Sequence, residues 1–311
     1  MPATDNKMIR VKHISKRFKK TLAVNDVTLA VEKGVIFGLL GPNAAGKTTL
    51  IRILCGIIKA DQGEVLINGL SSQKAKPVFG YVAQYFGQYE GLTVWENLEF
   101  YARMYGVTDK KRLDYLLQRY DLTQFKDLLA GTLSGGYKRR LALACALAHD
   151  PLVLFLDEPT AGIDPLTRKR LWDDFYQLSA EGKTLFVSTH YMEEAQRCHQ
   201  LAFMSAGTLV AKGSPTDMKH TLGDKRVYTS ILPYQPEVQT ALQKMAGLIL
   251  VNQFGNELRI VAQNNVKKEQ LEETIATIIQ QIIELDETEP NLEDAFIVLT
   301  QNQTSPATNR R

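Results

Sequence analysis

The sequence has few cysteines, no long apolar run and no strong excess of either charge. Its 311 residues include Cys55, Cys145 and Cys198, which are far apart and lie in apolar or helical surroundings. An odd number of cysteines at such spacing is atypical of a disulfide framework or a zinc site and indicates reduced thiols. No apolar run approaches the ~18–20 residues that a membrane span needs. The N-terminus, MPATDNKMIR, lacks the apolar region of a signal peptide. We therefore expect a cytoplasmic protein.

Charge is distributed unevenly along the chain, although the net charge is only +3. Residues 1–230 carry 31 lysines and arginines against 23 aspartates and glutamates, whereas residues 231–299 carry 4 against 11. This change of sign, beside Pro233 and Pro236, predicts a domain boundary near residue 230. The basic residues are scattered and lack interleaved aromatic residues, which argues against a nucleic-acid partner.

The length and composition are those of a globular protein with two domains. A chain of 311 residues, 44% hydrophobic and 23% charged, can form one large and one small domain. Residues 231–300 are predicted to form a small α+β domain, with strands at 248–251 and 258–261 and an amphipathic helix through Leu271, Ile275, Ile278 and Ile282. Residues 301–311, QNQTSPATNRR, are predicted to be a disordered tail.

A glycine-rich loop at residues 41–49, GPNAAGKTT, is the most informative stretch. An apolar run before it predicts a strand buried on both faces, and a helix is predicted to begin near Gly46. Strand, loop and helix are the context in which G-x-x-x-x-G-K-[ST] binds phosphate. Gly41 and Gly46 let backbone N–H groups approach a phosphate chain. Lys47 would reach the β- and γ-phosphates, and Thr48 offers a hard oxygen ligand to Mg²⁺.

Position 44 is alanine where this loop commonly carries glycine. If the φ angle of Ala44 is positive, its side chain costs roughly 1–2 kcal/mol. If φ is negative, nothing is lost. We expect phosphate binding to survive in either case, so the loop predicts a nucleoside triphosphate site.

The segments around this loop read as strands and helices. Residues 8–31 alternate like two strands joined by the turn RFKKT, where Phe18 either stacks on a purine or covers the edge of the sheet. Two strands, at 65–67 and 78–82, come before Gln84. A mainly helical stretch then runs from a capping box at Thr93 to about residue 129 and contains no catalytic pattern.

The stretch LSGGYKRRLALACALAHD, at residues 133–150, contains a second helix start. Ser134 is a good N-cap, two glycines follow, and an apolar helix continues to Ala148. A serine with two glycines at a helix N-terminus predicts a second anion site. An ordinary capped helix has the same pattern. The argument for an anion site therefore depends on the strand that follows.

That strand, LVLFLDEP at residues 152–159, ends in two carboxylates. Asp157 can hold Mg²⁺ through a water, and Glu158 can polarise the water that attacks the γ-phosphate. A later buried strand, 184–188, leads to His190. Because ligands bind at the carboxyl ends of strands in open α/β sheets, we expect His190 to contact the γ-phosphate.

GPNAAGKTT, Gln84, LSGGYKRR, LVLFLDEP, AGID and STHYMEEA follow one another in one order. The series resembles the nucleotide-binding subunit of ATP-binding cassette (ABC) transporters over roughly residues 8–220, and LSGG separates that family from other P-loop proteins. The resemblance implies that Glu158 is the catalytic base, with His190, Gln84 and Lys47 also catalytic. It implies Mg²⁺ contacts from Thr48, Gln84 and Asp157. The implied ATP contacts are Phe18, Gly41, Asn43, Ala44, Ala45, Gly46, Lys47, Thr48, Thr49, Ser134, Gly135, Gly136 and Asp164.

The resemblance also implies an architecture and partners. The expected fold is an α/β P-loop NTPase with a mostly parallel central sheet, an antiparallel β subdomain and a helical subdomain at about 85–150. Each ATP would lie between the P-loop of one subunit and the LSGG signature of another, so the chain would pair head to tail with itself or a similar subunit. A separately encoded transmembrane permease would hold it at the inner face of the cytoplasmic membrane.

The segments LTVWENL, STHYMEEA and PNLEDAFIVLT are similar to segments of subunits that serve exporters in bacteria. Residues 231–299 look like a small C-terminal domain that some of these subunits carry, for which we expect a regulatory or dimer-supporting role. Two other functions fit part of the pattern. An ABC ATPase acting on ribosomes or DNA usually carries two cassettes or a long coiled coil, which this chain lacks. A regulatory module with little turnover is disfavoured by Glu158 and His190.

Overall fold

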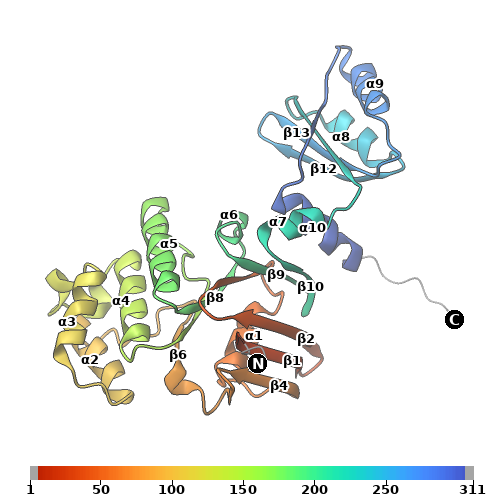
Figure 1. Ribbon diagram of the computed structural model, residues 1–311. Helices are drawn as coiled ribbons and strands as arrows, with labels where there is room; N and C mark the ends of the chain where they lie inside the picture. The colour runs from red at the N-terminus through yellow and green to blue at the C-terminus, as the bar shows by residue number, and fades with distance from the viewer. Residues whose placement is uncertain (1–5, 305–311) are drawn as a thin grey trace. The chain divides into compact units, whose positions relative to one another are not determined.

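A computed structural model of the protein describes residues 6–304 (Figure 1). The chain divides between Leu209 and Val210 into two compact units. The first contains the predicted motifs, and the second contains the acidic C-terminal region. Within the described residues, no helix combines the length and the apolar character needed to cross a membrane.

Six strands form the central sheet. They are β3 (Ile36–Leu40), β6 (Phe79–Val82), β7 (Val153–Asp157), β8 (Thr184–Thr189), β9 (Gln200–Ser205) and β10 (Thr208–Gly213). Their order is β10-β9-β3-β8-β7-β6, and the pairs from β9 to β6 are parallel. Every residue of β3, β7 and β8 is buried, as expected of parallel strands covered on both faces. The predicted mostly parallel central sheet is confirmed.

A second sheet, which is antiparallel, belongs to the first unit. It consists of β1 (Lys7–Phe18), β2 (Thr21–Glu32), β4 (Gln62–Ile67) and β5 (Leu70–Ser71), in the order β2-β1-β4-β5. The turn between β4 and β5 holds Asn68 and Gly69 at φ 49° and 77°, which a two-residue hairpin requires. The apolar faces of this sheet, of α1 (Lys47–Leu54) and of the central sheet share one core that includes Ile9, Leu50 and Phe155.

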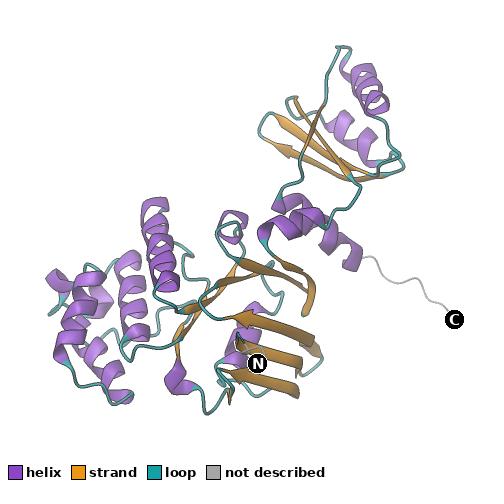
Figure 2. Ribbon diagram, viewed as in Figure 1, coloured by secondary structure: helices purple, strands orange, loops and turns teal. Residues whose placement is uncertain are grey.

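The remaining helices of this unit include three between the P-loop helix and β7, namely α2 (Val94–Met104), α3 (Lys110–Arg119) and α4 (Gly135–Leu147). They form the group beside α5 (Pro165–Ala180) in Figure 2, and α6 (Met192–Ala195) follows β8. The predicted capping box at Thr93 is present, since its hydroxyl accepts from the Glu96 N–H and the Glu96 carboxylate accepts from the Thr93 N–H. In and just after α3, the side chains of Leu113, Leu116, Leu117 and Tyr120 recur at helical spacing and are buried.

The second unit contains a four-stranded sheet and four helices within the described residues. Its strands, in sheet order, are β12 (Leu248–Phe254), β13 (Glu257–Ala262), β11 (Arg226–Ile231) and β14 (Asp286–Thr288). Its helices are α7 (Pro215–His220), α8 (Pro236–Gln243), α9 (Lys268–Ile279) and α10 (Leu292–Thr304). β12, β13 and α9 were predicted from the sequence. The prediction that Ile282 belongs to the same helix is wrong, because α9 ends at Ile279 and Ile282 is fully exposed.

Two predicted boundaries differ from the structure. The division of the chain lies at Leu209/Val210 and not near residue 230, because α7 packs against α10 and so joins the second unit. The predicted disordered tail began at residue 301, but α10 continues through Thr304. The rest of that predicted tail, residues 305–311, lies outside the described residues.

Candidate functional site

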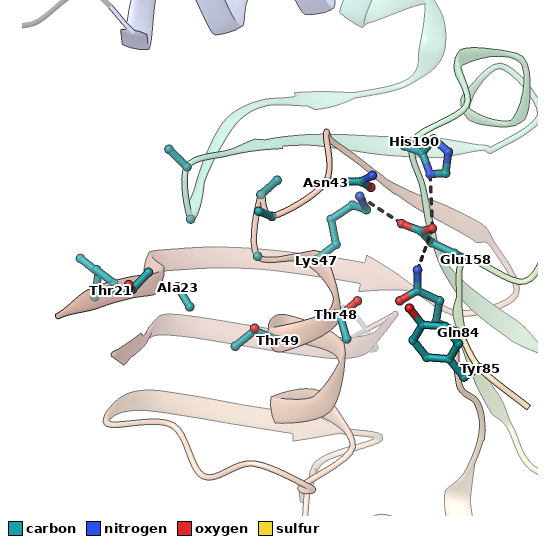
Figure 3. Close-up of a pocket in the computed structure, with 16 residues that line it drawn as sticks. Thr21, Ala23, Asn43, Lys47, Thr48, Thr49, Gln84, Tyr85, Glu158 and His190 are labelled. Carbon is teal, nitrogen blue, oxygen red and sulfur yellow. Dashed lines mark hydrogen bonds and ion pairs between the residues drawn. The ribbon is translucent and has the colours of Figure 1, made fainter. Parts of the chain in front are cut away.

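A cavity of about 770 Å³ lies at the P-loop (Figure 3). The loop after β3, the segment after β6, and the residues after β7 and β8 all contribute to it. These are carboxyl ends of parallel strands, where open α/β sheets bind ligands. The predicted residues that line it are Asn43, Ala44, Ala45, Gly46, Lys47, Thr48, Thr49, Gln84, Glu158 and His190. The lining residues that the sequence did not indicate are Thr21, Leu22, Ala23, Tyr85, Ala206 and Gly207.

The backbone of the loop explains its glycines. A Cβ atom on Gly41 would lie 2.3 Å from the Met204 carbonyl oxygen, and one on Gly46 would lie 2.3 Å from the Ala23 carbonyl oxygen. Gly46 also has φ 104°, which side chains rarely allow. Ala44 has φ 65°, so the positive alternative holds and its side chain is strained.

Lys47 is buried at the first turn of α1. Its ammonium group donates to the carbonyl oxygens of Gly41 at 2.7 Å and Pro42 at 3.1 Å. It also lies 3.3 Å from Oε1 of Glu158. A buried charge needs such partners, because desolvation without them is costly. The lysine is therefore held over its own loop, next to the predicted catalytic carboxylate.

Three predicted side chains meet at the carboxylate of Glu158 (Figure 3). Besides Lys47 at Oε1, Gln84 Nε2 donates to Oε2 at 3.2 Å, and His190 Nδ1 lies 3.3 Å from the same oxygen. The backbone N–H of Glu158 donates to the Ser188 carbonyl and hydroxyl oxygens, at 3.2 and 3.0 Å. Glu158 has φ 46°, a strained backbone of the kind that clusters at functional sites.

Asp157 is buried beneath the cavity and does not line it. Its Oδ1 accepts from the Ser188 hydroxyl at 2.6 Å and from the Thr48 hydroxyl at 3.1 Å, whereas Oδ2 is buried without a partner. Burial raises the pKa of Asp157, and the two hydroxyl hydrogen bonds oppose that rise. An unpartnered carboxylate oxygen beside a threonine hydroxyl fits Mg²⁺, which prefers hard oxygen ligands.

The sequence did not indicate the buried carboxylate of Glu194, which contacts the threonine directly before His190. Glu194 in α6 accepts hydrogen bonds from the hydroxyl groups of Thr160 and, at 2.7 Å, of Thr189. Thr160 lies two residues after Glu158, and Thr189 directly precedes His190. Glu194 therefore joins the ends of β7 and β8, and only the tertiary contact distinguishes it from the neighbouring Glu193.

The signature residues and three other predicted ATP contacts, namely Phe18, Gly41 and Asp164, do not line this cavity. Ser134 is the N-cap of α4 but makes no side-chain capping bond, and a Cβ atom on Gly135 would meet open space. Gly136 follows in the first turn. Asp164 caps α5 by accepting from the Thr167 N–H at 2.9 Å. Phe18 is 45% exposed at the end of β1, so its adenine contact stays a prediction.

Known proteins resemble this chain in sequence and in fold. The sequence pattern of the family described as "ABC transporter" matches residues 24–161. The chain is 40% identical to a probable multidrug ABC transporter ATP-binding protein of Escherichia coli over 68% of its own length, and spans only 38% of that relative. It is 34% identical to the linearmycin resistance ATP-binding protein of Bacillus subtilis, over 94% of this chain and 98% of the relative.

The structure is similar to solved cassettes. One is a dimeric post-hydrolysis state of the ATP-binding cassette MJ0796 bound to ADP and Pi, with a TM-score of 0.63 and 26% identity. The similarity covers 67% of this chain and 98% of that chain.

Proposed function

Because this chain belongs to the family of ABC transporter ATP-binding subunits, we propose that it hydrolyses ATP to power export through a membrane permease. The observation that carries the proposal is the meeting of Lys47, Gln84 and His190 at the carboxylate of Glu158. A carboxylate held beside a phosphate-binding lysine is in the right place to polarise an attacking water.

The residues around the cavity have different roles in hydrolysis. Lys47 and the loop N–H groups bind the phosphates of ATP, and Glu158 acts as the general base. Gln84 and His190 hold the Glu158 carboxylate and face the same cavity. Thr48, Asp157 and Gln84 would hold Mg²⁺, which neutralises phosphate charge when bound.

Ser134, Gly135, Gly136 and Asp164 have no place at the cavity of their own chain, which supports a site completed by a second subunit. The Ser134 hydroxyl makes no capping bond in its own helix. Together with the N–H groups of the first turn of α4, it forms an anion-binding site for the γ-phosphate of the partner's ATP. The partner is a second copy or a similar subunit, paired head to tail under two-fold symmetry.

Exposed aromatic and apolar side chains between residues 85 and 105 suit a permease. Tyr85, Tyr89 and Met104 are 78%, 52% and 65% exposed, respectively. Such side chains are typical of protein interfaces. A permease docked there would hold the chain at the inner face of the cytoplasmic membrane and sense movement of Gln84. Crosslinks from residues 85–105 to the permease support this assignment, and crosslinks confined to the second unit contradict it.

The test of hydrolysis is Glu158→Gln. Loss of the general base should lower kcat by roughly 10²–10⁴-fold while ATP still binds, so that an ATP-bound dimer accumulates. Phosphate release measures the first effect, and light scattering of the chain in ATP measures the second. Glu193→Gln, at an exposed carboxylate near the site, is the matched control and should behave like the wild type. Unchanged steady-state hydrolysis in Glu158→Gln would count against the proposal.

A further inference from the structure

Arg139 lies in α4 and joins three backbone carbonyl groups around the site. Its guanidinium group donates to the carbonyl oxygens of Ala83 at 2.7 Å, Gln84 at 2.9 Å and Glu158 at 3.2 Å. Two of these carbonyl groups belong to Gln84 and Glu158, whose side chains are hydrogen-bonded to each other. One half-buried side chain therefore fixes the backbone on both sides of that contact.

The chemistry of arginine suits this position. A guanidinium group is a rigid planar fork that donates in several directions at once, whereas a lysine ammonium is a point charge on a flexible stem. Burial lowers the pKa of Arg139, and the carboxylates of Asp157 and Glu158 oppose that change. The charge is thus held close to two acids while the hydrogen bonds go to backbone oxygens.

The helix that carries Arg139 also carries the signature residues. Ser134 is the N-cap of α4, and Arg139 follows five residues later, about 7.5 Å along the helix axis. The preceding residue of α4, Lys138, contacts the residues that follow Gln84. Its ammonium group lies 2.9 Å from Glu90 Oε1 and 5.1 Å from the centre of the Phe86 ring. α4 therefore holds residues 83–90 by two successive side chains.

We propose that Arg139 is a positioning residue that couples the signature end of α4 to Gln84 and Glu158 of the same chain. This rests on the proposed function, in which Ser134 meets the ATP of the partner. A displacement of α4 by that ATP moves the guanidinium group, and with it the backbone of Gln84 and Glu158. Each subunit thereby adjusts its own hydrolytic site to the occupancy of the other.

The matched control is Arg112, which uses the same chemistry at the opposite end of α4. Its guanidinium group donates to the carbonyl oxygens of Leu147 at 2.7 Å and Ala148 at 2.8 Å. These contacts hold the C-terminal end of the helix and involve none of the residues that line the cavity. Arg112→Gln thus measures the structural cost of losing such a contact.

The experiment compares ATP hydrolysis by the full chain and by Arg139→Gln, Arg139→Lys and Arg112→Gln, together with the Tm of each. We expect Arg139→Gln to lower kcat by roughly 10- to 100-fold, since small misplacements of catalytic groups have effects of this size. Its KM should stay within about two-fold of the wild type, and the Hill coefficient should fall toward one. Arg139→Lys should recover part of kcat. Arg112→Gln should lower Tm while leaving kcat and the Hill coefficient near the wild-type values.

Hydrolysis by Arg139→Gln at the wild-type rate and Hill coefficient would overturn the proposal. Equal losses in Arg139→Gln and Arg112→Gln would also overturn it, since the effect would then be structural. Failure of the proposed function looks different, because the wild-type chain itself would not release phosphate. In that case all four proteins would be inactive, independently of position 139.

Discussion

At the scale of single residues, three side chains that line the cavity, those of Ala44, Glu158 and Ala206, stand on left-handed backbone. Ala44 and Glu158 have φ 65° and 46°, where a Cβ atom is crowded. At Glu158 the strained backbone carries the carboxylate that is proposed as the general base. At Ala44 no side-chain hydrogen bond or ion pair offsets the strain, since a methyl group can make neither.

Ala44→Gly should therefore stabilise the first unit, by up to about 1 kcal/mol, because glycine adopts a positive φ without crowding. Thermal denaturation measures the change, and KM for ATP should stay near the wild-type value. Ala45→Gly is the control at the next position, where φ is not positive and the methyl group is buried. It should destabilise the protein by roughly 0.5–1 kcal/mol. A less stable Ala44→Gly protein would contradict this explanation.

His149, to which the sequence assigned no role, has a structural one. Its ring stacks on Tyr105 with centroids 3.8 Å apart, and Nε2 lies 3.1 Å from the Phe79 carbonyl oxygen. Nε2 therefore carries the proton of the neutral ring, and Nδ1 is buried without a partner. Burial lowers the pKa of His149, because a second proton would sit on that isolated nitrogen.

The surroundings of His149 fix the sign of a pH effect. Arg112 and Lys183 also lower its pKa, while the Phe79 carbonyl and Asp150 raise it. Since the folded pKa lies below the unfolded value near 6.5, the unfolded chain takes up the proton first as the pH falls. The contribution to stability is thus present above about pH 6.5 and is lost on acidification toward the folded pKa.

We accordingly predict that Tm falls more steeply between pH 7.5 and pH 5.5 in the wild type than in His149→Phe, which keeps a ring against Tyr105. Equal slopes in the wild type and His149→Phe would refute the role assigned to His149.

At the scale of elements, α10 is fixed to the sheet of the second unit by a buried ion pair. Arg259 of β13 donates to Asp294 of α10 through Nε at 2.9 and 3.1 Å and through a terminal nitrogen at 2.7 Å. The same guanidinium group donates to the Glu289 carbonyl oxygen at 3.0 Å. Both side chains are buried, so removing one partner leaves an uncompensated charge.

Asp294→Asn should reduce the stability of the second unit by about 3–5 kcal/mol. Hydrogen exchange of the amides of β12 and β13 reports this unit specifically, and their protection should fall. Glu287→Gln breaks the exposed pair of Arg226 and Glu287, 3.5 Å apart in the same sheet. Glu287→Gln should reduce the stability of the second unit by less than about 1 kcal/mol. Comparable losses in the two variants would show that burial does not decide the effect.

At the scale of the whole molecule, the two halves of the proposed nucleotide site lie on different parts of the chain. Lys47 and Glu158 face the cavity, whereas Ser134 does not. In a head-to-tail dimer, a defect in Lys47 and a defect in Ser134 affect different components of a site. Mixing the two defective chains should therefore restore one intact site in each mixed dimer.

We predict that Lys47→Ala and Ser134→Glu are each nearly inactive, and that an equal mixture hydrolyses ATP at up to roughly a quarter of the wild-type rate. Half of the dimers are then mixed, and one of their two sites is intact. A mixture of Lys47→Ala with Glu158→Gln is the control and should recover nothing, because both defects lie in the same half of the site. No recovery in the first mixture would indicate that the signature does not act across subunits.

Features determined by neighbouring residues could be predicted from the sequence. The P-loop between β3 and α1, the Thr93 capping box and the hairpin at Asn68 and Gly69 follow from residue types at fixed local spacing. The buried strands β3, β7 and β8 follow from continuous apolar runs. Because these motifs stand at strand ends or helix starts, Lys47, Glu158 and His190 could also be expected at one edge of the central sheet.

Contacts between residues far apart in the chain were decided only by the tertiary structure. Gln84 and Glu158 are 74 positions apart, and nothing local indicates that Arg139 holds the backbone of both. The boundary at Leu209 likewise depends on α7 packing against α10, and not on the change of charge at residue 230. A motif carries the chemistry of its own residues, but the partner of a buried charge or carbonyl group is chosen by how the elements pack.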